Sequence, residues 1–129
     1  MLKTLKNVYF HVTKKLFDAV DPHKRSPEWG KLEHAFVKAY PTCAACGATT
    51  KLQVHHKHPF HIHPELELDP NNLVTLCMEV GKECHLYVGH GDSWRAYNPN
   101  LEADLVTLNN DPSARTIIIA EAKKNRLMQ

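Results

Sequence analysis

Four residues near the middle of the chain have side chains that suit phosphodiester hydrolysis. Two adjacent histidines, His55 and His56, are followed by Asn72 and then by His85. A neutral imidazole can take a proton from water near pH 7, and an imidazole nitrogen can also bind a divalent metal ion. These residues therefore indicate a general base beside a metal site, the combination with which enzymes cleave phosphodiester bonds.

The same region contains all four cysteines, Cys43, Cys46, Cys77 and Cys84. The first two form a Cys-x2-Cys pair followed by Gly47, which lets the backbone turn beneath a metal ion. The other two would complete four thiolate ligands for one Zn²⁺. Two disulfides are the alternative, but every cysteine fits the metal pattern and there is no secretory signal. Because four protein ligands close a zinc site, we expect this zinc to be structural.

The residues between the cysteine pairs predict a β-hairpin with a long connection. Lys51–His56 alternates as a half-buried strand does, so the two histidines at its end should point to opposite faces. One of them can then bind metal while the other stays free to accept a proton. Asn72–Cys77 predicts the return strand, and residues 57–71, which contain three prolines, predict the connecting loop. His85 should begin a short helix and point back at the hairpin.

Three segments in this region resemble the HNH endonuclease family. They are Val-His-His-Lys-His-Pro-Phe, Pro-Asn-Asn-Leu-Val-Thr-Leu-Cys and Cys-His-Leu-Tyr-Val-Gly-His, and the resemblance runs from about Cys43 to Asn98. It implies an α+β fold, in which a ββα-metal centre with the four-cysteine zinc site is flanked by N-terminal and C-terminal helices. The flanking helices are similar to those of small HNH proteins of phages and bacteria.

The resemblance also implies a role for each motif residue. His55 is similar to the family's first metal ligand, and His56 to its general base. Asn72 matches the central asparagine, whose amide braces the long loop and so orients the base. His85 matches the last motif histidine, a ligand of the catalytic metal ion, which we expect to be Mg²⁺ or Mn²⁺.

The spacing after the third cysteine departs from the compact members of that family. Six residues, 78–83, separate Cys77 from Cys84, so the zinc knuckle is enlarged. His90 is a candidate third ligand of the catalytic metal, as in family members with three histidines on the metal. Its offset from His85 is five residues, which is not an α-helical i,i+4 pair, and Gly89 could end the helix between them.

Together these features predict a metal-dependent DNA endonuclease. As the resemblance implies, the products should carry 5′-phosphate and 3′-hydroxyl ends. A single active centre should nick one strand per encounter, so cleavage of both strands would require a homodimer or a second binding event. The alternative is a zinc-ribbon nucleic-acid-binding module whose histidines do not catalyse. We expect a cytoplasmic protein encoded by a bacterium or a phage.

The other histidines and two aromatic residues have more ordinary explanations. Loop histidines could touch a phosphate but are more often solvated or brace the backbone; these are His58, His61 and His63. Histidines outside the motif are expected at the surface or in helix packing; these are His11, His23 and His34. Trp94 and Tyr97 could stack on bases, although aromatic residues near a small core more often pack within it.

Length and composition indicate one domain. The chain has 129 residues, 43% of them hydrophobic, which suffices for one small zinc-stapled core. We expect a single domain over residues 1–129, with a helical arm at 1–42, the ββα-metal core at 43–98 and helices at 99–129. No segment of the sequence reads as a membrane span.

Apolar residues at helical spacing predict the N-terminal helices. The first covers 2–20 and is basic on its other face. The second should have Ser26 as its N-cap and Pro27 as its first residue, and it should run through Tyr40 to Pro41.

Two further helices are predicted after the core. One should follow Asn98-Pro99-Asn100, and the other should begin near Ser113 and reach Met128. Three late cations suit the C-terminal end of that helix, so they need not bind DNA.

The charge distribution suggests where phosphates would bind. The net charge of +2 is too small to prove a nucleic-acid partner. However, residues 1–42 hold eight Lys/Arg against four Asp/Glu, whereas residues 43–98 hold four against six. The N-terminal part is therefore the expected phosphate-contacting arm, with a solvated helix face as the alternative explanation.

Overall fold

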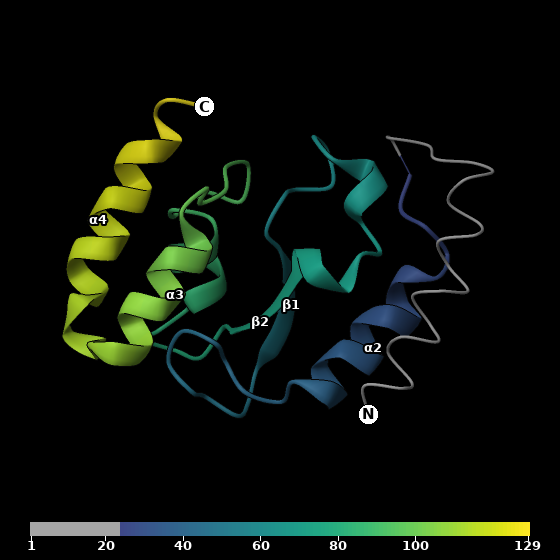
Figure 1. The fold of residues 1–129 in the computed structure, drawn as a ribbon, viewed down its shortest axis with the longest axis horizontal. Helices are drawn as coiled ribbons and strands as arrows, with labels where there is room; N and C mark the ends of the chain where they lie inside the picture. Colours follow the sequence, from purple (N-terminus) through teal and green to yellow (C-terminus); the bar gives the residue numbers. More distant parts are fainter. Residues whose placement is uncertain (1–23) are drawn as a thin grey trace.

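The hairpin lies at the centre of the molecule, between helices on either side. The computed structural model describes residues 24–129, so the helix expected over 2–20 lies outside the described residues. In Figure 1, α2 lies to one side of the hairpin, and α3 and α4 lie to the other. Within residues 24–129, no helix is both long enough and apolar enough to cross a lipid bilayer.

The two strands pair as an antiparallel hairpin, as the sequence predicts. β1 (Leu52–His56) and β2 (Leu73–Cys77) form a sheet of their own, with His56 opposite Leu73. Two short 3-10 turns, η1 (Pro64–Leu66) and η2 (Pro70–Asn72), lie in the long connection. The hairpin therefore brings both ends of this loop together beside His56.

Asn72 does not open the return strand, contrary to the sequence prediction. It is the last residue of η2, and β2 begins one residue later. The reason is the preceding Asp69, whose side chain accepts a hydrogen bond from the Asn71 amide at 2.9 Å and so holds the backbone in a turn. Asn72 is buried there, and its side chain is turned into the loop rather than into a sheet face.

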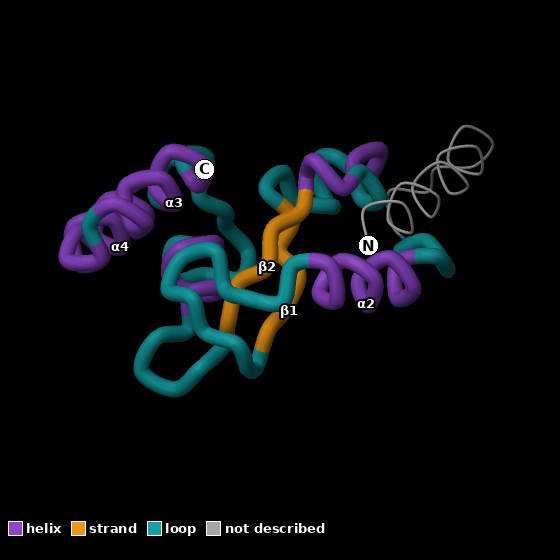
Figure 2. Tube along the Cα trace, turned by 60° about the horizontal axis from the view of Figure 1, so that its bottom comes forward, coloured by secondary structure: helices purple, strands orange, loops and turns teal. Residues whose placement is uncertain are grey.

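Each face of the hairpin is covered by a separate apolar core. One core lies under α2 (Trp29–Ala39) and consists of Leu32, Phe36, Val54, Leu68 and Leu73. The other lies on the C-terminal side and consists of Cys43, Ala45, Leu76, Cys77, Cys84, Val88, Leu101, Leu108 and Ile118. Figure 2 shows α2 and the C-terminal helices on opposite sides of the strands. Successive strand residues point to opposite faces, so adjacent histidines on β1 meet different surroundings.

Helix α2 begins two residues later than its predicted start. The Ser26 hydroxyl accepts a hydrogen bond from the Glu28 amide at 3.1 Å, and the Ser26 carbonyl accepts one from the Trp29 amide at 3.1 Å. Ser26 therefore stabilises a turn ahead of the helix instead of capping its first residue. The helix ends at Ala39, and Tyr40 is its C-cap.

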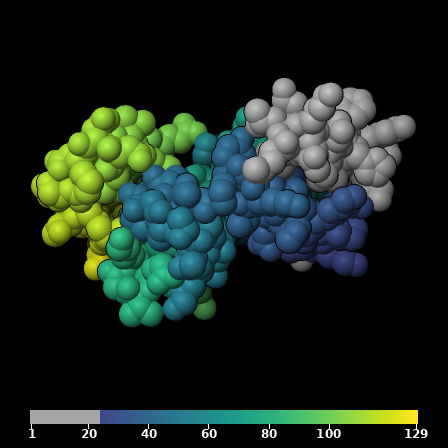
Figure 3. All heavy atoms as spheres, turned by 90° about the horizontal axis from the view of Figure 1, so that it is seen from below, coloured from purple at the N-terminus to yellow at the C-terminus, as the bar shows by residue number. Residues whose placement is uncertain are grey.

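The C-terminal helices occupy nearly the predicted positions. α3 covers Leu101–Asn110 and α4 covers Arg115–Arg126, with the short turn η4 (Pro112–Ala114) between them. The Asp111 side chain accepts a hydrogen bond from the Ser113 amide at 3.1 Å, so Ser113 lies in η4 and α4 starts two residues further on. In the view of Figure 3, these helices form one end of the molecule and the described part of the N-terminal side forms the other.

Candidate metal and catalytic sites

The four cysteines come together although two sequence segments supply them. Their Sγ atoms all lie within 4.8 Å of one another, and the Sγ atoms of Cys46 and Cys77 are 3.6 Å apart. The first pair lies on a tight turn in which the Gly47 amide donates to the Cys43 carbonyl at 2.8 Å, with Gly47 at φ +79°. All four lie within the described residues, and none forms a disulfide. The cluster suggests a zinc site with four thiolate ligands.

The surroundings of the cluster favour a thiolate. A side-chain hydrogen bond with Cys84, supported by backbone amides, lowers the pKa of the Cys43 thiol to about 4 in spite of its burial. The same contact, together with burial, raises the pKa of the Cys84 thiol. The two opposite shifts show that Cys43 is the more acidic thiol of the pair, and a divalent cation would favour the thiolate form of both.

The enlarged knuckle at 78–83 is held by an arginine that sequence reasoning missed. Arg115, the first residue of α4, donates from Nη1 to the Cys84 Sγ at 3.1 Å. Its Nη2 donates to the Lys82 carbonyl. Nothing in the spacing of the motif points to a residue 31 positions beyond Cys84, because only the packing of α4 brings it there. Arg115 therefore fixes the segment that leads into His85.

Three histidines form a second cluster, separate from the cysteines. Ligand nitrogens of His55, His85 and His90 all lie within 4.8 Å of one another. His55 comes from β1, His85 is the first residue of the π-helical turn η3 (His85–Gly89), and His90 directly follows that turn. A π-helix is wider than an α-helix and pairs residues five apart. This explains why His90 reaches the cluster although its offset is wrong for an α-helix.

In two of these rings, the Nδ1 atom already takes part in a hydrogen bond. His85 Nδ1 lies 2.8 Å from the Gln53 side-chain oxygen, and His90 Nδ1 lies 2.6 Å from the Ala96 carbonyl. Both oxygens accept hydrogen bonds, so each Nδ1 carries the proton and each Nε2 keeps its lone pair. Such an outer hydrogen bond is typical of a metal-bound histidine.

The surroundings of His55 are the strongest indication that this cluster fits a cation. It is 1% exposed, and neither of its ring nitrogens has a hydrogen-bond partner among residues 24–129. A buried polar nitrogen without a partner is costly unless a ligand satisfies it. Three imidazole ligands suit a divalent transition metal. They bind Mg²⁺ less readily. The residues present therefore fit a divalent metal ion.

The backbone leaves just enough space for the His55 ring. A Cβ atom at Gly89 would lie 3.1 Å from both Cε1 and Nδ1 of His55 and 3.1 Å from the Leu76 Cδ1. A side chain at this position would push the ring or the strand away. Gly89 thus has a steric role. The sequence alone suggested only that Gly89 could end the helix.

Burial keeps the three rings neutral. It lowers the pKa of His85 to about 3, and it lowers the pKa of His55 well below its ordinary value, with further effects from the other two rings. Burial also lowers the pKa of His90, although the bond to Ala96 opposes the shift. Neutral imidazoles are the form that binds metal, so protons compete weakly here at pH 7.

His56 lies on the opposite face of β1, toward α2. Its Nε2 lies 2.9 Å from the Glu67 carbonyl oxygen, and its ring centroid is 4.4 Å from that of Trp29. The carbonyl must accept, so Nε2 carries the proton and Nδ1 keeps its lone pair. Burial lowers the pKa of His56 to about 4, a shift that the Glu67 carbonyl only partly opposes. The ring is therefore neutral at pH 7 and can accept a proton at Nδ1.

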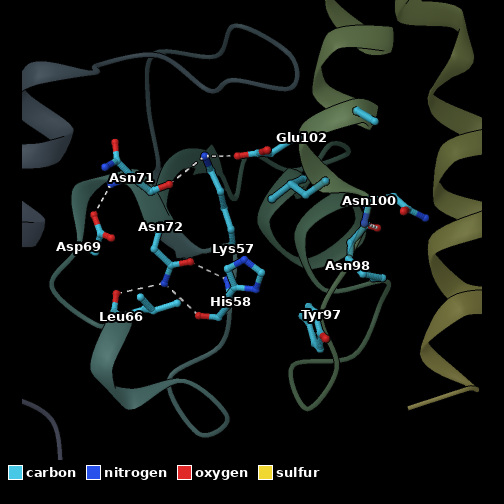
Figure 4. Close-up of a pocket in the computed structure, with 13 residues that line it drawn as sticks. Lys57, His58, Leu66, Asp69, Asn71, Asn72, Tyr97, Asn98, Asn100 and Glu102 are labelled. Carbon is cyan, nitrogen blue, oxygen red and sulfur yellow. Dashed lines mark hydrogen bonds and ion pairs between the residues drawn. The ribbon is translucent and has the colours of Figure 1, made fainter. Parts of the chain in front are cut away.

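Asn72 ties the two ends of the loop together (Figure 4). Its Nδ2 donates to the His58 carbonyl at 3.0 Å and to the Leu66 carbonyl at 3.1 Å. Its Oδ1 accepts from the His58 amide at 2.8 Å. Leu66 precedes Glu67, whose carbonyl holds His56, so the Asn72 amide fixes the segment that orients this ring.

A family model matches the part of the chain that carries both clusters. Residues 43–91 match the HNH endonuclease family. The match covers both strands, the cysteine cluster and His55, His85 and His90. No curated protein and no solved structure gave a significant match to the chain. Proteins of the HNH family are generally nucleases that act on DNA and use divalent metals.

A pocket of about 350 Å³ is lined by histidines from both faces of β1 and its neighbouring turn. His56, His85 and His90 all line it, although His56 and the ring of His55 lie on opposite faces of β1. Its remaining wall is made by Arg25, Trp29, Glu33, Val54, Pro59, Phe60, His61 and Trp94. Sequence reasoning did not single out Arg25, Trp29 or Phe60. Arg25 and Trp29 lie outside the HNH segment, and Phe60 ends a motif segment in which no role was assigned to it.

A larger pocket of about 640 Å³ lies between the loop and the start of α3. Lys57 and Asn72 line it, and the Lys57 Nζ forms an ion pair with Glu102 Oε1 at 2.8 Å (Figure 4). None of the clustered histidines reaches it. This pocket lies where the HNH segment is joined to α3.

The remaining histidines of the described chain lie away from both clusters or only at their margin. His58 contacts His63 at 5.4 Å between ring centroids, and His63 Nδ1 lies 3.0 Å from Glu65 Oε1. His61 is exposed and lines the 350 Å³ pocket, and His34 is exposed. His11 and His23 lie outside the described residues.

Proposed function

We propose that this protein is a metal-dependent DNA endonuclease that nicks one strand at a time. The observation that carries the proposal is the shared pocket, which brings His56 and two of the three clustered histidines to one cavity. A general base and a metal site must reach the same phosphate to hydrolyse it. The HNH match supports a nuclease of DNA as the general class.

His56 is the proposed general base. It accepts a proton at Nδ1 from the attacking water, while its Nε2–H remains bonded to the Glu67 carbonyl. This carbonyl also stabilises the imidazolium that forms, because it faces the N–H that becomes more positive. The depressed pKa keeps the base neutral before the reaction, at the cost of a weaker drive for proton transfer.

His55, His85 and His90 are the residues that would hold the catalytic divalent ion. Such an ion supplies positive charge for the phosphoryl oxygen and for the departing 3′ oxygen. Gln53 and the Ala96 carbonyl fix two of the rings so that their Nε2 atoms face the cluster. The four-cysteine cluster has the separate role of a structural zinc site.

Asn72 is a positioning residue in this mechanism. It touches neither the water nor the phosphate, but its hydrogen bonds to His58 and Leu66 hold the loop that carries the Glu67 carbonyl. The products would carry 5′-phosphate and 3′-hydroxyl ends. With one such centre among residues 24–129, a double-strand break would require two protomers or two successive encounters.

The experiment is nicking of supercoiled plasmid in Mn²⁺ or Mg²⁺ by the wild type and by His56→Gln. Glutamine can still donate a hydrogen bond to the Glu67 carbonyl but offers no base of similar strength. Loss of a positioned base costs roughly 10²- to 10⁴-fold in rate. His34→Gln is the matched control, since that exposed histidine lies outside both clusters.

Two results would contradict the proposal: nicking by the wild type with no added metal, and nicking by His56→Gln at the wild-type rate. Metal-independent DNA binding without any cutting would favour a zinc-ribbon binding module.

A further inference from the structure

Trp94 lies at the edge of the histidine cluster with half of its surface uncovered. Its ring centroid is 5.0 Å from that of His85 and 5.0 Å from that of His90, at interplanar angles of 84° and 59°. Neither imidazole lies flat on the indole, and the side chain is 52% exposed. The sequence favoured a packing role for Trp94, but a packing residue would bury most of this large apolar surface.

The pocket beside Trp94 has the size and the lining of a site for one nucleotide. Its volume of about 350 Å³ lies within the range of small-ligand pockets. Three large aromatic side chains line it, namely Trp29, Phe60 and Trp94. Aromatic rings recognise nucleic acid by stacking on the face of a base. Stacking on an aromatic ring does not select one base, because every base has such a face.

Arg25 supplies a cation on the other wall of the same pocket. Its guanidinium carbon lies 4.6 Å from the ring centroid of Phe60 and 5.4 Å from that of Trp29. Its Nη1 is 3.3 Å from the Oε2 of Glu67, which is 2% exposed, while the Arg25 side chain is 50% exposed. The buried carboxylate thus fixes one edge of the guanidinium. A guanidinium has five N–H donors, so others remain for a phosphate.

The state of the DNA follows from what each group can recognise. In a duplex the base faces are covered by their neighbours, and the grooves present only base edges and the sugar-phosphate backbone. An aromatic ring such as Trp94 gains a stacking partner only where a base has left the stack. Arg25 in the wall of the same pocket offers a positive charge to the phosphate of that nucleotide.

We propose that this pocket binds one unpaired nucleotide, with its base on Trp94 and its phosphate on Arg25, so that the substrate is single-stranded or locally unpaired DNA. This inference rests on the proposed endonuclease function and names the substrate class of that site. Trp94 and Arg25 come from segments about 70 positions apart in the chain, and the HNH match at residues 43–91 includes neither of them.

The test measures binding without cleavage. The full chain carrying His56→Gln is titrated, with no divalent metal added, into a labelled single-stranded oligodeoxynucleotide without self-complementarity and into the blunt-ended duplex of that strand with its complement. Base stacking on one aromatic side chain corresponds to roughly a 5- to 150-fold change in affinity. Trp94→Ala should therefore weaken single-strand binding by that factor and change duplex binding less than about 2-fold. Trp94→Phe should restore most of the affinity.

Two controls separate stacking from structure. Tyr97→Ala removes an aromatic side chain that lines the other pocket, so it should leave both affinities unchanged. The chain has two tryptophans, so Trp29→Phe leaves Trp94 as the only one, and its emission should be quenched by the single strand but not by the duplex. Arg25→Gln should weaken single-strand binding and reduce the slope of log affinity against log salt by about 0.7.

The outcomes distinguish this inference from the proposed function. If the single strand binds as described but no substrate is ever nicked, the proposed function fails while the pocket assignment stands. Equal losses on single strand and duplex in Trp94→Ala, or no loss on either, overturn the inference whatever the nicking assay shows. A Trp94→Ala variant that loses Mn²⁺ affinity but keeps its oligonucleotide affinity would also overturn it, because Trp94 would then only shield the histidines.

Discussion

His85 and His90 are five residues apart in the sequence, yet their ring centroids are 5.0 Å apart. The π-helical turn between them accounts for this, because its wider circumference returns the chain to the same side after five residues rather than four. The Gly89 at the end of this turn leaves room for the His55 ring. The turn therefore does two things at once: it aligns two candidate ligands and makes space for the third.

The cysteine cluster should be required for the fold. Cys43→Ser removes one of four thiolates, and the metal analysis should fall from about one zinc per chain to well below it. Because zinc binding to such sites contributes directly to folding, the variant should also lose its cooperative thermal unfolding transition. Thr42→Ser, at an exposed neighbouring position, serves as the control. A Cys43→Ser protein with full zinc content, or the discovery of disulfides, would show that the cluster is not a zinc site.

The three histidines should act together in binding the catalytic metal. His90→Ala should lower Mn²⁺ affinity by more than about tenfold in a calorimetric titration, since it removes one ligand. Gln53→Ala leaves all three ligands in place but frees His85 Nδ1, and the expected loss is roughly 10-fold. Zinc content should be unchanged in both variants. Wild-type Mn²⁺ affinity in His90→Ala would restrict the site to His55 and His85.

Gly89 should not tolerate a side chain, whereas Gly30 should. In Gly89→Ala the new methyl group would lie 3.1 Å from the His55 ring, so we expect a loss of about 1–3 kcal/mol in the free energy of unfolding and weaker Mn²⁺ binding. Gly30 lies in α2, where a Cβ atom would meet nothing within 4 Å, and Gly30→Ala should stabilise the helix by up to about 1 kcal/mol. Urea unfolding of the two variants checks the pair. Equal effects would mean that the space beside His55 is not limiting.

Asn72→Ala should slow cleavage without abolishing it. The substitution removes the hydrogen bonds that hold His58 and Leu66, so the loop that carries the Glu67 carbonyl becomes less well fixed. We expect a smaller loss in kcat than in His56→Gln, with a similar KM, because Asn72 does not touch the substrate. The comparison requires initial nicking rates for both variants. An Asn72→Ala loss as large as that of His56→Gln would assign Asn72 a direct part in the chemistry.

His56 should make the protein less stable in acid. Its pKa is about 4 in the folded protein and about 6.5 in an unfolded chain, so the unfolded state binds more protons between these values. The stabilisation by neutral His56 is therefore present above about pH 6.5 and is lost as the pH falls toward 4, by up to about 3 kcal/mol. His56→Gln lacks this term but keeps the other histidines, so the difference in unfolding free energy between wild type and variant should shrink over that range. Parallel curves for the two proteins would contradict the prediction.

The sequence by itself determined the hairpin, the cysteine frame and the identity of the central histidines. These are local properties: strand alternation separates His55 from His56, and the spacing of Cys43 and Cys46 suits one metal ion. The helix starts were less accurate, because Ser26 and Asp111 stabilise turns ahead of α2 and α4 through hydrogen bonds that a sequence pattern does not separate from helix caps.

Only the tertiary structure decided which residues meet. The sequence left His90 open because it applied α-helical spacing, and the π-helical turn reversed that argument. It gave no reason to join Arg115 to Cys84, or Arg25 to the pocket that His56, His85 and His90 line, because these residues come from segments that are distant in the chain. Such contacts depend on how α2 and α4 pack against the two faces of the hairpin, and packing is set by the whole chain rather than by local spacing.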